Sequence, residues 1–380
     1  MIGRRLSGRS ALRSIAASLI ATVVLGGCLA GPTPTPPSSS TPSTVVQPTP
    51  GPSALGTAPS PSAPSAPSAT SARATIDPAA VRGLLVLTNQ AVASRLELIG
   101  DDGVARAVPL PDPAVSWMST DLAGHILATT RAGRAFLSGR VAADGATTWQ
   151  RLQLSGIAIS RLAGPIVSGS LSPDGNRAAF VAADLSTGQP FDVVVVDTRT
   201  GAGRVVGIDL GFGGPAPAWL GRKLLLLTRG TDDHVGSTVI DSLTGVVTQG
   251  PGPGRAASST DATAWRDEIA ALVASADGRT VAVVSRTTGR LKVIDGGAWL
   301  NRAGAGGVDV PLGPAPGGFS PEVIWTLALS PAAERLALVR TDTANQPIAV
   351  TIHAASAGWA EVARIPVAAG TGEVALAWLP

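Results

Sequence analysis

The chain has 380 residues with 29 Lys+Arg and 26 Asp+Glu, which give a formal net charge of +3 and a pI near 9.9. Four of the arginines fall within the first 27 residues, and that stretch contains no acidic residue. The remainder carries 25 basic against 26 acidic residues. It therefore does not have the excess of positive charge on which nucleic-acid binding depends, and we expect no nucleic-acid partner.

The N-terminal 27 residues have the pattern of a secretory signal peptide. Residues 1–13 are positively charged, residues 14–27 are apolar or small, and Cys28 follows directly. The apolar stretch is shorter than the roughly 20 residues that a membrane-spanning helix needs. We expect cleavage between Gly27 and Cys28, and no transmembrane helix in the mature protein.

The residues Leu25-Gly26-Gly27-Cys28 resemble the lipobox of bacterial lipoproteins. The resemblance implies that Cys28 is lipidated and anchors an extracytoplasmic protein to a membrane of the cell envelope. Two or three acyl chains, at about 0.8 kcal/mol per buried methylene, are enough for durable anchoring. The alternative is an ordinary signal peptide followed by a chance cysteine, and the choice between inner and outer membrane stays open.

Residues 28–75 have the composition of a disordered tether. Thirty of the 45 residues from 31 to 75 are Pro, Ser or Thr, and Arg73 is the only charged one. Such a segment buries too little apolar surface to offset its ordering entropy. In a polyproline II conformation, at about 3.1 Å per residue, it reaches up to roughly 140 Å. We expect it to hold a folded domain, residues 76–380, away from the membrane.

From residue 76 onward, short apolar runs alternate with turn residues every 8–12 positions, which is typical of an all-β chain. The unit LSPDGNRAAFV at 171–181 recurs as ASADGRTVAVV at 274–284 and as LSPAAERLALV at 329–339. Weaker forms occur at 119–129 and 218–228. Pro, Asp and Gly favour tight turns, so we expect each unit to be a turn that leads into a strand. The units at 218–228 and 329–339 depart from this turn motif.

A second recurring element places an aspartate directly after an apolar run. It occurs at Asp197, Asp241 and Asp295, and a glycine follows each time. Asp and Gly are the residues that hairpin turns prefer. We interpret these positions as turns between the outer strands of each unit, with calcium binding by the aspartates as the alternative.

The repeat period predicts a β-propeller. Equivalent positions at 119, 172, 219, 275, 330 and 378 recur about every 52 residues, which suits one four-stranded blade per repeat. Five contiguous blades are expected near 116–155, 167–210, 215–250, 269–312 and 323–367. The sixth combines residues 83–110 with a C-terminal strand at 373–379 that closes the first blade. A seventh blade is the alternative if residues 251–268 contain weak strands.

These SPDG-type units resemble the repeats of TolB-like and WD40-like (PD40-type) propellers. Together with the lipobox and the Pro/Ser/Thr segment, they are also similar to bacterial propeller lipoproteins, including the propeller half of LpqB-type lipoproteins. The resemblance covers residues 76–380 through the rhythm of the repeats. The domain that precedes the propeller in LpqB-type proteins has no room in this chain.

The sequence has few residues suited to catalysis or metal binding. Its three histidines do not form a spacing typical of a zinc site. His125 and His353 fall in strand-like segments, and we expect His125 to pack within a blade. His234 lies beside Asp232 and Asp233, which makes it the best metal candidate against the simpler interpretation of a solvated turn. We expect no catalytic residue, metal or cofactor.

Eight tryptophans occur in the chain, beside five Phe and no Tyr. Trp117, Trp219, Trp325 and Trp378 recur near the start of units, so we expect them to be core wedges between blades. Trp265 and Trp299 lie in or beside the long loops 251–268 and 296–308. Because recognition often uses irregular loops on a rigid scaffold, these two residues are candidates for a binding rim, with disordered surface connections as the alternative.

Taken together, these features predict a membrane-anchored extracytoplasmic lipoprotein whose propeller is a non-catalytic binding or scaffolding module for a protein or an envelope component. The alternative is a small-ligand sensor, or a metal-dependent hydrolase or lactonase that uses the central channel. Fold alone does not decide between them. The partner, its biological process and the oligomeric state cannot be predicted from these residues.

Overall fold

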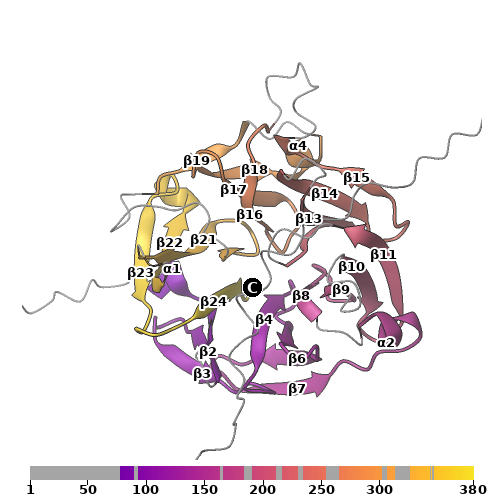
Figure 1. The fold of residues 1–380 in the computed structure, drawn as a ribbon. Helices are drawn as coiled ribbons and strands as arrows, with labels where there is room; N and C mark the ends of the chain where they lie inside the picture. Colours follow the sequence, from indigo (N-terminus) through magenta and orange to yellow (C-terminus); the bar gives the residue numbers. More distant parts are fainter. Residues whose placement is uncertain are drawn as a thin grey trace, which may run out of the picture. The chain divides into compact units, whose positions relative to one another are not determined.

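The computed structural model shows six four-stranded antiparallel sheets arranged as the blades of a ring (Figure 1). The sequence prediction of an all-β, six-bladed propeller is therefore confirmed. The structure describes residues 78–89, 93–162, 166–183, 191–210, 216–229, 234–253, 265–301, 306–312, 326–342, 344 and 346–380.

The blades follow one another along the chain, and each is ordered from the innermost strand outward. Blades 1 to 3 consist of the following strands: β24 (Glu373–Trp378), β1 (Leu84–Asn89), β2 (Ser94–Ile99) and β3 (Ala105–Val108); β4 (Val115–Thr120), β5 (Ile126–Thr130), β6 (Ala135–Val141) and β7 (Thr147–Arg151); β8 (Ile166–Leu171), β9 (Arg177–Ala183), β10 (Phe191–Asp197) and β11 (Gly203–Leu210). Blades 4 to 6 are built in the same way: β12 (Ala218–Leu220), β13 (Lys223–Arg229), β14 (Val235–Asp241) and β15 (Val247–Gln249); β16 (Ile269–Ala274), β17 (Thr280–Ser285), β18 (Leu291–Asp295) and β19 (Val308–Val310); β20 (Leu327–Leu329), β21 (Arg335–Thr341), β22 (Pro347–Ala354) and β23 (Glu361–Pro366).

Blade 1 is split between the two ends of the propeller, as the sequence predicts. Its inner strand β24 pairs antiparallel with β1 from Leu84↔Trp378 to Asn89↔Glu373. The last strand of the domain thereby completes the first sheet. This closure removes the two unpaired strand edges that an open ring of blades would leave.

The core lies between neighbouring blades. Successive residues of β1 point to opposite sides of the sheet: Leu84 and Val86 pack in one cluster with blade 6, and Leu85 and Leu87 pack in another with blade 2. Both faces of a blade are buried in this way. Runs such as LLVL at 84–87 and LLLL at 224–227 are consequently apolar at every position instead of alternating.

One end of the ring, which we call the turn face, carries the connections between the first and second and between the third and fourth strands of each blade. Most of them are short turns, but residues 296–307 of blade 5 make a longer connection that begins with helix α4 (Gly296–Leu300). Neighbouring turns bond to each other through the backbone: Leu122 donates to the carbonyl of Pro173 at 3.1 Å, and Asp277 donates to that of Pro331 at 3.2 Å. The backbone thus joins the turns of blades 2 and 3 and the turns of blades 5 and 6.

The opposite end, which we call the connection face, carries the links from one blade to the next. These links span residues 109–114, 152–165, 211–217, 250–268, 311–326 and 367–372. The link at 152–165 contains the short helix α2 (Ile157–Arg161). Other short helices of the described chain are α1 (Pro78–Val81), α4 (Gly296–Leu300) and η3 (Ala355–Ala357).

The turn motif is structurally the same in three blades although its sequence varies. Gly175, Gly278 and Ala333 all have positive φ, at 68°, 67° and 56°. Each donates its backbone N–H to the carbonyl of the serine that opens the turn, at 2.8 Å. The unit at 329–339, which departs from the motif in sequence, therefore forms the same turn with an alanine at the left-handed position.

Candidate functional site

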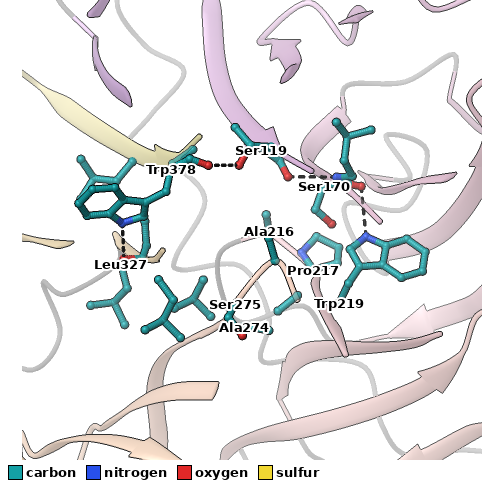
Figure 2. Close-up of a pocket in the computed structure, with 18 of the residues that line it drawn as sticks. Ser119, Ser170, Ala216, Pro217, Trp219, Ala274, Ser275, Leu327 and Trp378 are labelled. Carbon is teal, nitrogen blue, oxygen red and sulfur yellow. Dashed lines mark hydrogen bonds between the residues drawn. The ribbon is translucent and has the colours of Figure 1, made fainter. Parts of the chain in front are cut away.

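The inner strands of the six blades surround a central cavity of about 110 Å³ (Figure 2). Trp378 and Trp219 lie on opposite sides of it, with Ser119 between them along the wall. Residues of all six inner strands contribute to the lining, and the longest contributing segments are 117–120, 216–219 and 271–276. A small central cavity is thus present where the propeller resemblance implies a channel.

Side chains from neighbouring blades bond to the inner strand edges around this cavity. Thr120 Oγ1 donates to the Trp378 carbonyl at 2.7 Å, and Trp378 Nε1 donates to the Ala328 carbonyl at 3.0 Å. On the other side, Trp219 Nε1 donates to the Ser170 carbonyl at 3.3 Å. The inner strand of a blade has no partner strand on its channel side, so these bonds satisfy backbone groups that would otherwise be left without a protein partner.

Trp219 and Trp378 are wedges between blades, as the sequence predicts. Both indoles are buried, and each lies under a guanidinium group from the preceding blade: Arg177 over Trp219 at 5.4 Å, and Arg335 over Trp378 at 4.7 Å. An arginine over an indole face adds a cation–π attraction of about 0.5–2 kcal/mol. Trp117 is only partly buried and lines the cavity, whereas Trp325 lies outside the described residues.

The cavity wall is apolar with a few hydroxyl groups. Its lining in the described chain consists of Ala, Leu, Val, Met, Pro and Trp together with Ser119, Thr120, Ser170 and Ser275. The Ser170 hydroxyl is buried and has no hydrogen-bond partner among the described residues. An unpartnered hydroxyl on an apolar wall suits water or a small uncharged molecule. None of the lining residues named for this cavity is acidic, basic or histidine, so its wall offers no group for acid–base chemistry at neutral pH.

The structure places Trp265 and Trp299 in the core, not at the rim. Trp265 is 5% exposed and Trp299 is 0% exposed. Their rings meet edge to face at a centroid distance of 5.8 Å, within the cluster that joins blades 4 and 5. The prediction that these indoles line a binding rim is therefore wrong for the side chains themselves. The physical reason is that an indole buries roughly 150–250 Å² of mostly apolar surface, and the gap between the two blades accommodates both rings.

Polar groups gather where the link at 250–268 enters blade 5. The Asp267 carboxylate accepts from Ser285 Oγ at 2.6 Å and from Thr288 Oγ1 at 3.3 Å. The adjacent Glu268 pairs with the ring of His234, which belongs to blade 4. These contacts join the link 250–268 to the hairpins between the second and third strands of blades 4 and 5, which also lie on the connection face. Asp232 and Asp233, the predicted neighbours of His234, lie outside the described residues.

The other two histidines have contrasting surroundings. His353 is completely buried in β22, and its Nδ1 donates to the Trp359 carbonyl at 2.9 Å. Burial lowers the pKa of His353 because it disfavours the charged form. His125 lies in the turn before β5 with its ring bonded to buried Asp121 at 2.6 Å, and it is 44% exposed. The expectation that His125 packs within a blade is wrong, because the carboxylate holds the ring at the turn face.

The aspartates at the hairpin turns bond to their own turns. Asp197 Oδ1 accepts from Thr200 N at 2.7 Å and from Arg199 N at 3.1 Å, and these bonds lower its pKa. Asp241 accepts from Lys223 Nζ at 3.0 Å and from two backbone N–H groups, which lower its pKa further. Turn chemistry accounts for both carboxylates. In the part of the chain that the structure describes, no three His, Cys, Asp or Glu residues are grouped to hold a metal ion.

Sequence reasoning missed the arginines that cover the inter-blade tryptophans. The signal for them is present, since Arg177 and Arg335 stand at the same place in their units, two residues after the left-handed position of the turn, where blade 5 has Thr280. Both arginines lie over an indole. Their recurrence does not show which side chain of the next blade they contact, because that depends on how the blades pack.

The predicted lipidation site, Cys28, and the cleavage position at Gly27 lie outside the described residues, as do the signal peptide and the proposed tether of residues 28–75. They remain predictions from the sequence. Among the residues with described coordinates, no helix has the length and apolarity required to cross a membrane.

No protein-family model matches the sequence, and no curated protein matches it. Among solved structures, TolB from Acinetobacter baumannii superimposes with a TM-score of 0.53 at 17% sequence identity, over 78% of this chain. The match covers 66% of the TolB chain, slightly less than two thirds of its length. A chain of the nidogen/laminin complex matches with a TM-score of 0.49 at 12% identity, over 78% of this chain and 98% of its own. At these identities the likeness concerns the fold alone: this chain is a six-bladed β-propeller whose fold is similar to that of TolB.

Proposed function

We propose that this chain is a membrane-anchored extracytoplasmic lipoprotein whose propeller is a non-catalytic module that binds a protein or an envelope component. The membrane attachment rests on the lipobox-like residues that end at Cys28 and on the Pro/Ser/Thr-rich segment that follows. The observation that carries the binding role is the difference between the two ends of the ring. One end has mostly short turns, two pairs of which bond to each other through the backbone, and the other carries the six links between blades, which differ in length.

The connection face is the surface that we assign to the partner. Links on a rigid scaffold vary without disturbing the fold, and for that reason binding residues concentrate on them. Here side-chain hydrogen bonds of Thr120, Trp219 and Trp378 join neighbouring inner strands at three places around the axis of the ring. The ring thereby offers fixed positions from which the links can form a recognition surface.

A second candidate function is binding of a small uncharged molecule in the central cavity. The buried Ser170 hydroxyl, which has no partner within the described chain, favours it. The apolar lining argues for an uncharged ligand, and the hydrolase or lactonase that such channels can host would need carboxylates that this wall does not supply.

The first experiment is in-cell crosslinking followed by purification of the full-length protein. Metabolic labelling with an alkyne fatty acid tests lipidation, and Cys28→Ala is expected to lose the label and the membrane fraction. Replacing residues 254–264 with a Gly/Ser linker removes part of a link while it spares the buried Trp265. A discrete crosslinked partner should be recovered with the wild type and lost with this replacement.

Two matched arginines provide the control for position. Arg290 lies in the exposed hairpin turn of blade 5 on the connection face, and Arg199 lies in an exposed hairpin turn of blade 3 on the turn face. Arg290→Glu is expected to reduce the crosslinked partner several-fold, whereas Arg199→Glu leaves it unchanged. Equal loss in both variants, or no partner under conditions that recover known envelope complexes, contradicts the proposal.

A further inference from the structure

The side chains around the central cavity differ between its two sides (Figure 2). Blades 2 and 3 contribute three hydroxyl groups, those of Ser119, Thr120 and Ser170. Blades 5, 6 and 1 contribute segments that contain only Ala, Leu and Val, namely 271–274, 327–329 and 376–377. The hydroxyl of Ser275, which also belongs to the lining, donates to the Asp277 carboxylate within its own turn. One side of the cavity thus offers hydroxyl groups, and the other offers hydrocarbon.

The three hydroxyl groups of blades 2 and 3 differ in their partners. Thr120 Oγ1 donates its proton to the Trp378 carbonyl. Ser119 Oγ accepts from Leu171 N at 3.0 Å, and its own proton has no acceptor in the described chain. Ser170, which precedes Leu171, is 6% exposed, and its hydroxyl bonds to no described residue. Ser119 and Ser170 therefore leave two neighbouring hydroxyl groups available to a bound molecule.

The unpartnered hydroxyl of Ser170 is unusual for a buried position. Most buried polar groups in folded proteins have a hydrogen-bond partner, and leaving one without a partner is destabilising. Ser170 lies opposite Ala179 of β9, and Ala179 packs in the same cluster as Trp219. Opposite residues of paired strands share one face of the sheet, so Ser170 faces blade 4, beside Trp219 and Pro217 at the edge of the cavity (Figure 2). A polar group of a bound molecule would satisfy this hydroxyl.

The cavity extends to the turn face. The inner strands run from the connection face to the turn face, and the lining continues beyond β8 to Pro173 and beyond β16 to Ser275 and Ala276. These three residues belong to the turns that follow the two strands. From β24 the lining contains only residues 376–378, which are the ones nearest the turn face. A small molecule therefore has access to the cavity at the end opposite to the surface that we assign to the partner.

The composition of the wall limits the chemistry of a ligand. None of the lining residues named for this cavity is charged, so a charged molecule would lose its hydration without gaining a counter-ion. A purely apolar molecule would leave the Ser170 hydroxyl without a partner, and a sugar would place several hydroxyl groups against hydrocarbon. The volume of about 110 Å³ suits a compact molecule. The wall is matched by a neutral molecule with one polar group and a small apolar body.

We infer that the central cavity binds a compact neutral alcohol or ketone, with its oxygen bonded to Ser170 and Ser119 and its hydrocarbon part against blades 5, 6 and 1. This inference rests on the second candidate function proposed above, and it names the class of ligand and its orientation. Both hydroxyl groups can donate to the oxygen of the ligand, and Ser170 can also accept from an alcohol. The ligand enters at the turn face and leaves the links of the connection face available to a partner.

The test uses the full-length protein and three probes with the same five-membered carbon ring: cyclopentanol, cyclopentane and cyclopentanecarboxylate. Ligand-observed saturation-transfer NMR gives the Kd of each probe. We expect cyclopentanol to bind, and the carboxylate to bind about 10-fold more weakly or not at all, because its charge finds no counter-ion in the wall. Similar binding of the carboxylate and the alcohol would overturn the assigned ligand class.

Two serine variants test the hydrogen bond. Ser170→Ala removes the hydroxyl that we assign to the ligand, and it should raise the Kd of cyclopentanol about 3-fold or more while it changes that of cyclopentane less than about 2-fold. Ser168→Ala is the matched control, because Ser168 is 3% exposed on the same strand and its hydroxyl also lacks a partner in the described chain, but it is not part of the lining. It should leave both constants unchanged. Each variant removes an unpartnered hydroxyl, so both are expected to fold like the parent.

The route of entry is tested at the turn face. Ala276→Trp places a large side chain in the turn beyond β16, and it should reduce the saturation transfer to cyclopentanol several-fold. Ala332→Trp, in the exposed turn of blade 6 outside the lining, should leave it unchanged. Equal signals in the two variants would overturn entry from the turn face.

The outcomes separate this inference from the proposed functions. If cyclopentanol binds equally well to the parent and to Ser170→Ala, or if Ser168→Ala weakens it as much, the cavity remains a binding site and the assigned orientation is overturned. If none of the three probes binds, the second candidate function fails together with this inference. The partner-binding role is measured separately, because Ser170→Ala should give the same crosslinked partner as the wild type.

Discussion

Tryptophan side chains fill two of the interfaces between neighbouring blades, which we call seams, and they do so in different ways. At the seam between blades 6 and 1, Trp378 Nε1 donates to the Ala328 carbonyl at 3.0 Å while Arg335 covers the ring at 4.7 Å. At the seam between blades 4 and 5, Trp265 and Trp299 contact each other edge to face. The buried Nε1 of Trp299 has no hydrogen-bond partner within the described parts of the chain.

A hydrogen bond between blades fixes the first seam. The second seam depends on the volume of the two packed indoles, and Trp265 Nε1 donates within its own link, to the Asp267 carbonyl at 2.8 Å. Blade 1 carries the closure of the ring, because its inner strand β24 pairs with β1 from the opposite end of the domain sequence. The hydrogen bonds of Trp378 and Thr120 tie this last strand to blade 6 on one side and to blade 2 on the other. We call the seam between blades 6 and 1, where the last strand packs, the closing seam.

The largest effect is expected from removing the strand that closes the ring. Deleting residues 373–380 removes β24, whose residues from Val374 to Trp378 are all buried. Loss of one core tryptophan costs about 3–5 kcal/mol, and a whole domain is stable by only about 5–15 kcal/mol. We expect the truncated domain to lose its cooperative thermal transition, measured by circular dichroism.

Deleting Pro380 alone is the matched control, and it should melt like the parent because β24 and the Leu379–Gly83 backbone bond stay in place. If the 373–380 deletion also melts like the parent, the closing seam contributes little and the contrast between the two seams is lost.

The sequence predicted this closure because the repeat is encoded locally. Turn residues such as Pro173, Asp174 and Gly175 have their conformational preferences in isolation, so their spacing reveals the blades and the incomplete first unit. The expected blade ranges, for example 167–210 and 269–312, agree within a few residues with the observed strands from Ile166 to Leu210 and from Ile269 to Val310.

A pair of Trp→Phe substitutions tests the seams directly. Trp378→Phe removes the donor to the buried Ala328 carbonyl, and an unsatisfied buried acceptor costs about 1–3 kcal/mol. Trp299→Phe removes an N–H that bonds to no described residue, so only ring volume is lost. In urea denaturation, we expect Trp378→Phe to lower the free energy of unfolding by more than Trp299→Phe does, and the difference should be on the order of 1 kcal/mol.

Equal losses in the two variants would show that volume, and not the hydrogen bond, stabilises the closing seam. Trp219→Phe provides an internal comparison, because its indole also donates across a seam, to the Ser170 carbonyl. It should behave like Trp378→Phe.

A smaller, pH-dependent effect is expected in blade 6, beside the closing seam. The buried His353 has its pKa lowered below the ordinary value of 6.5, chiefly by burial. Between the lowered pKa and 6.5, the unfolded chain binds a proton that the folded chain does not, so stability falls as the pH drops below about 6.5. One such group contributes a slope of at most about 1.4 kcal/mol per pH unit.

The measurement compares urea unfolding between pH 7.5 and 5 for the parent and for His353→Asn, whose side-chain amide can replace the Nδ1 donor to the Trp359 carbonyl. The variant should show a shallower loss on the acid side. An unchanged slope would assign the pH dependence to other groups.

The candidate site was less predictable than the fold. The sequence predicted a recognition role for Trp265 and Trp299 because they fall outside the repeat. Whether these two side chains are buried, however, is decided by how blades 4 and 5 pack. The same limit applies to His125, which a turn carboxylate holds at the surface. The wedges Trp219 and Trp378 were predictable because they recur in phase with the blades, and recurrence is visible in the sequence.

The smallest expected effect concerns the turn of blade 6, next to the closing seam. Ala333 has φ = 56°, where the equivalent Gly175 and Gly278 have 68° and 67°. A left-handed conformation costs a non-glycine residue roughly 1–2 kcal/mol. Replacing that residue with glycine removes this cost, but the greater entropy of the unfolded chain with glycine offsets about 0.4–1 kcal/mol of the gain. We expect Ala333→Gly to raise the free energy of unfolding by at most about 1 kcal/mol, measured by urea denaturation. The opposite change, Gly278→Ala, should destabilise by more, because a Cβ there lies 2.6 Å from the Gly221 nitrogen. A loss of stability in Ala333→Gly would mean that packing of the Ala333 methyl group outweighs its backbone strain, and that this turn is held by its neighbours and not by its own residues.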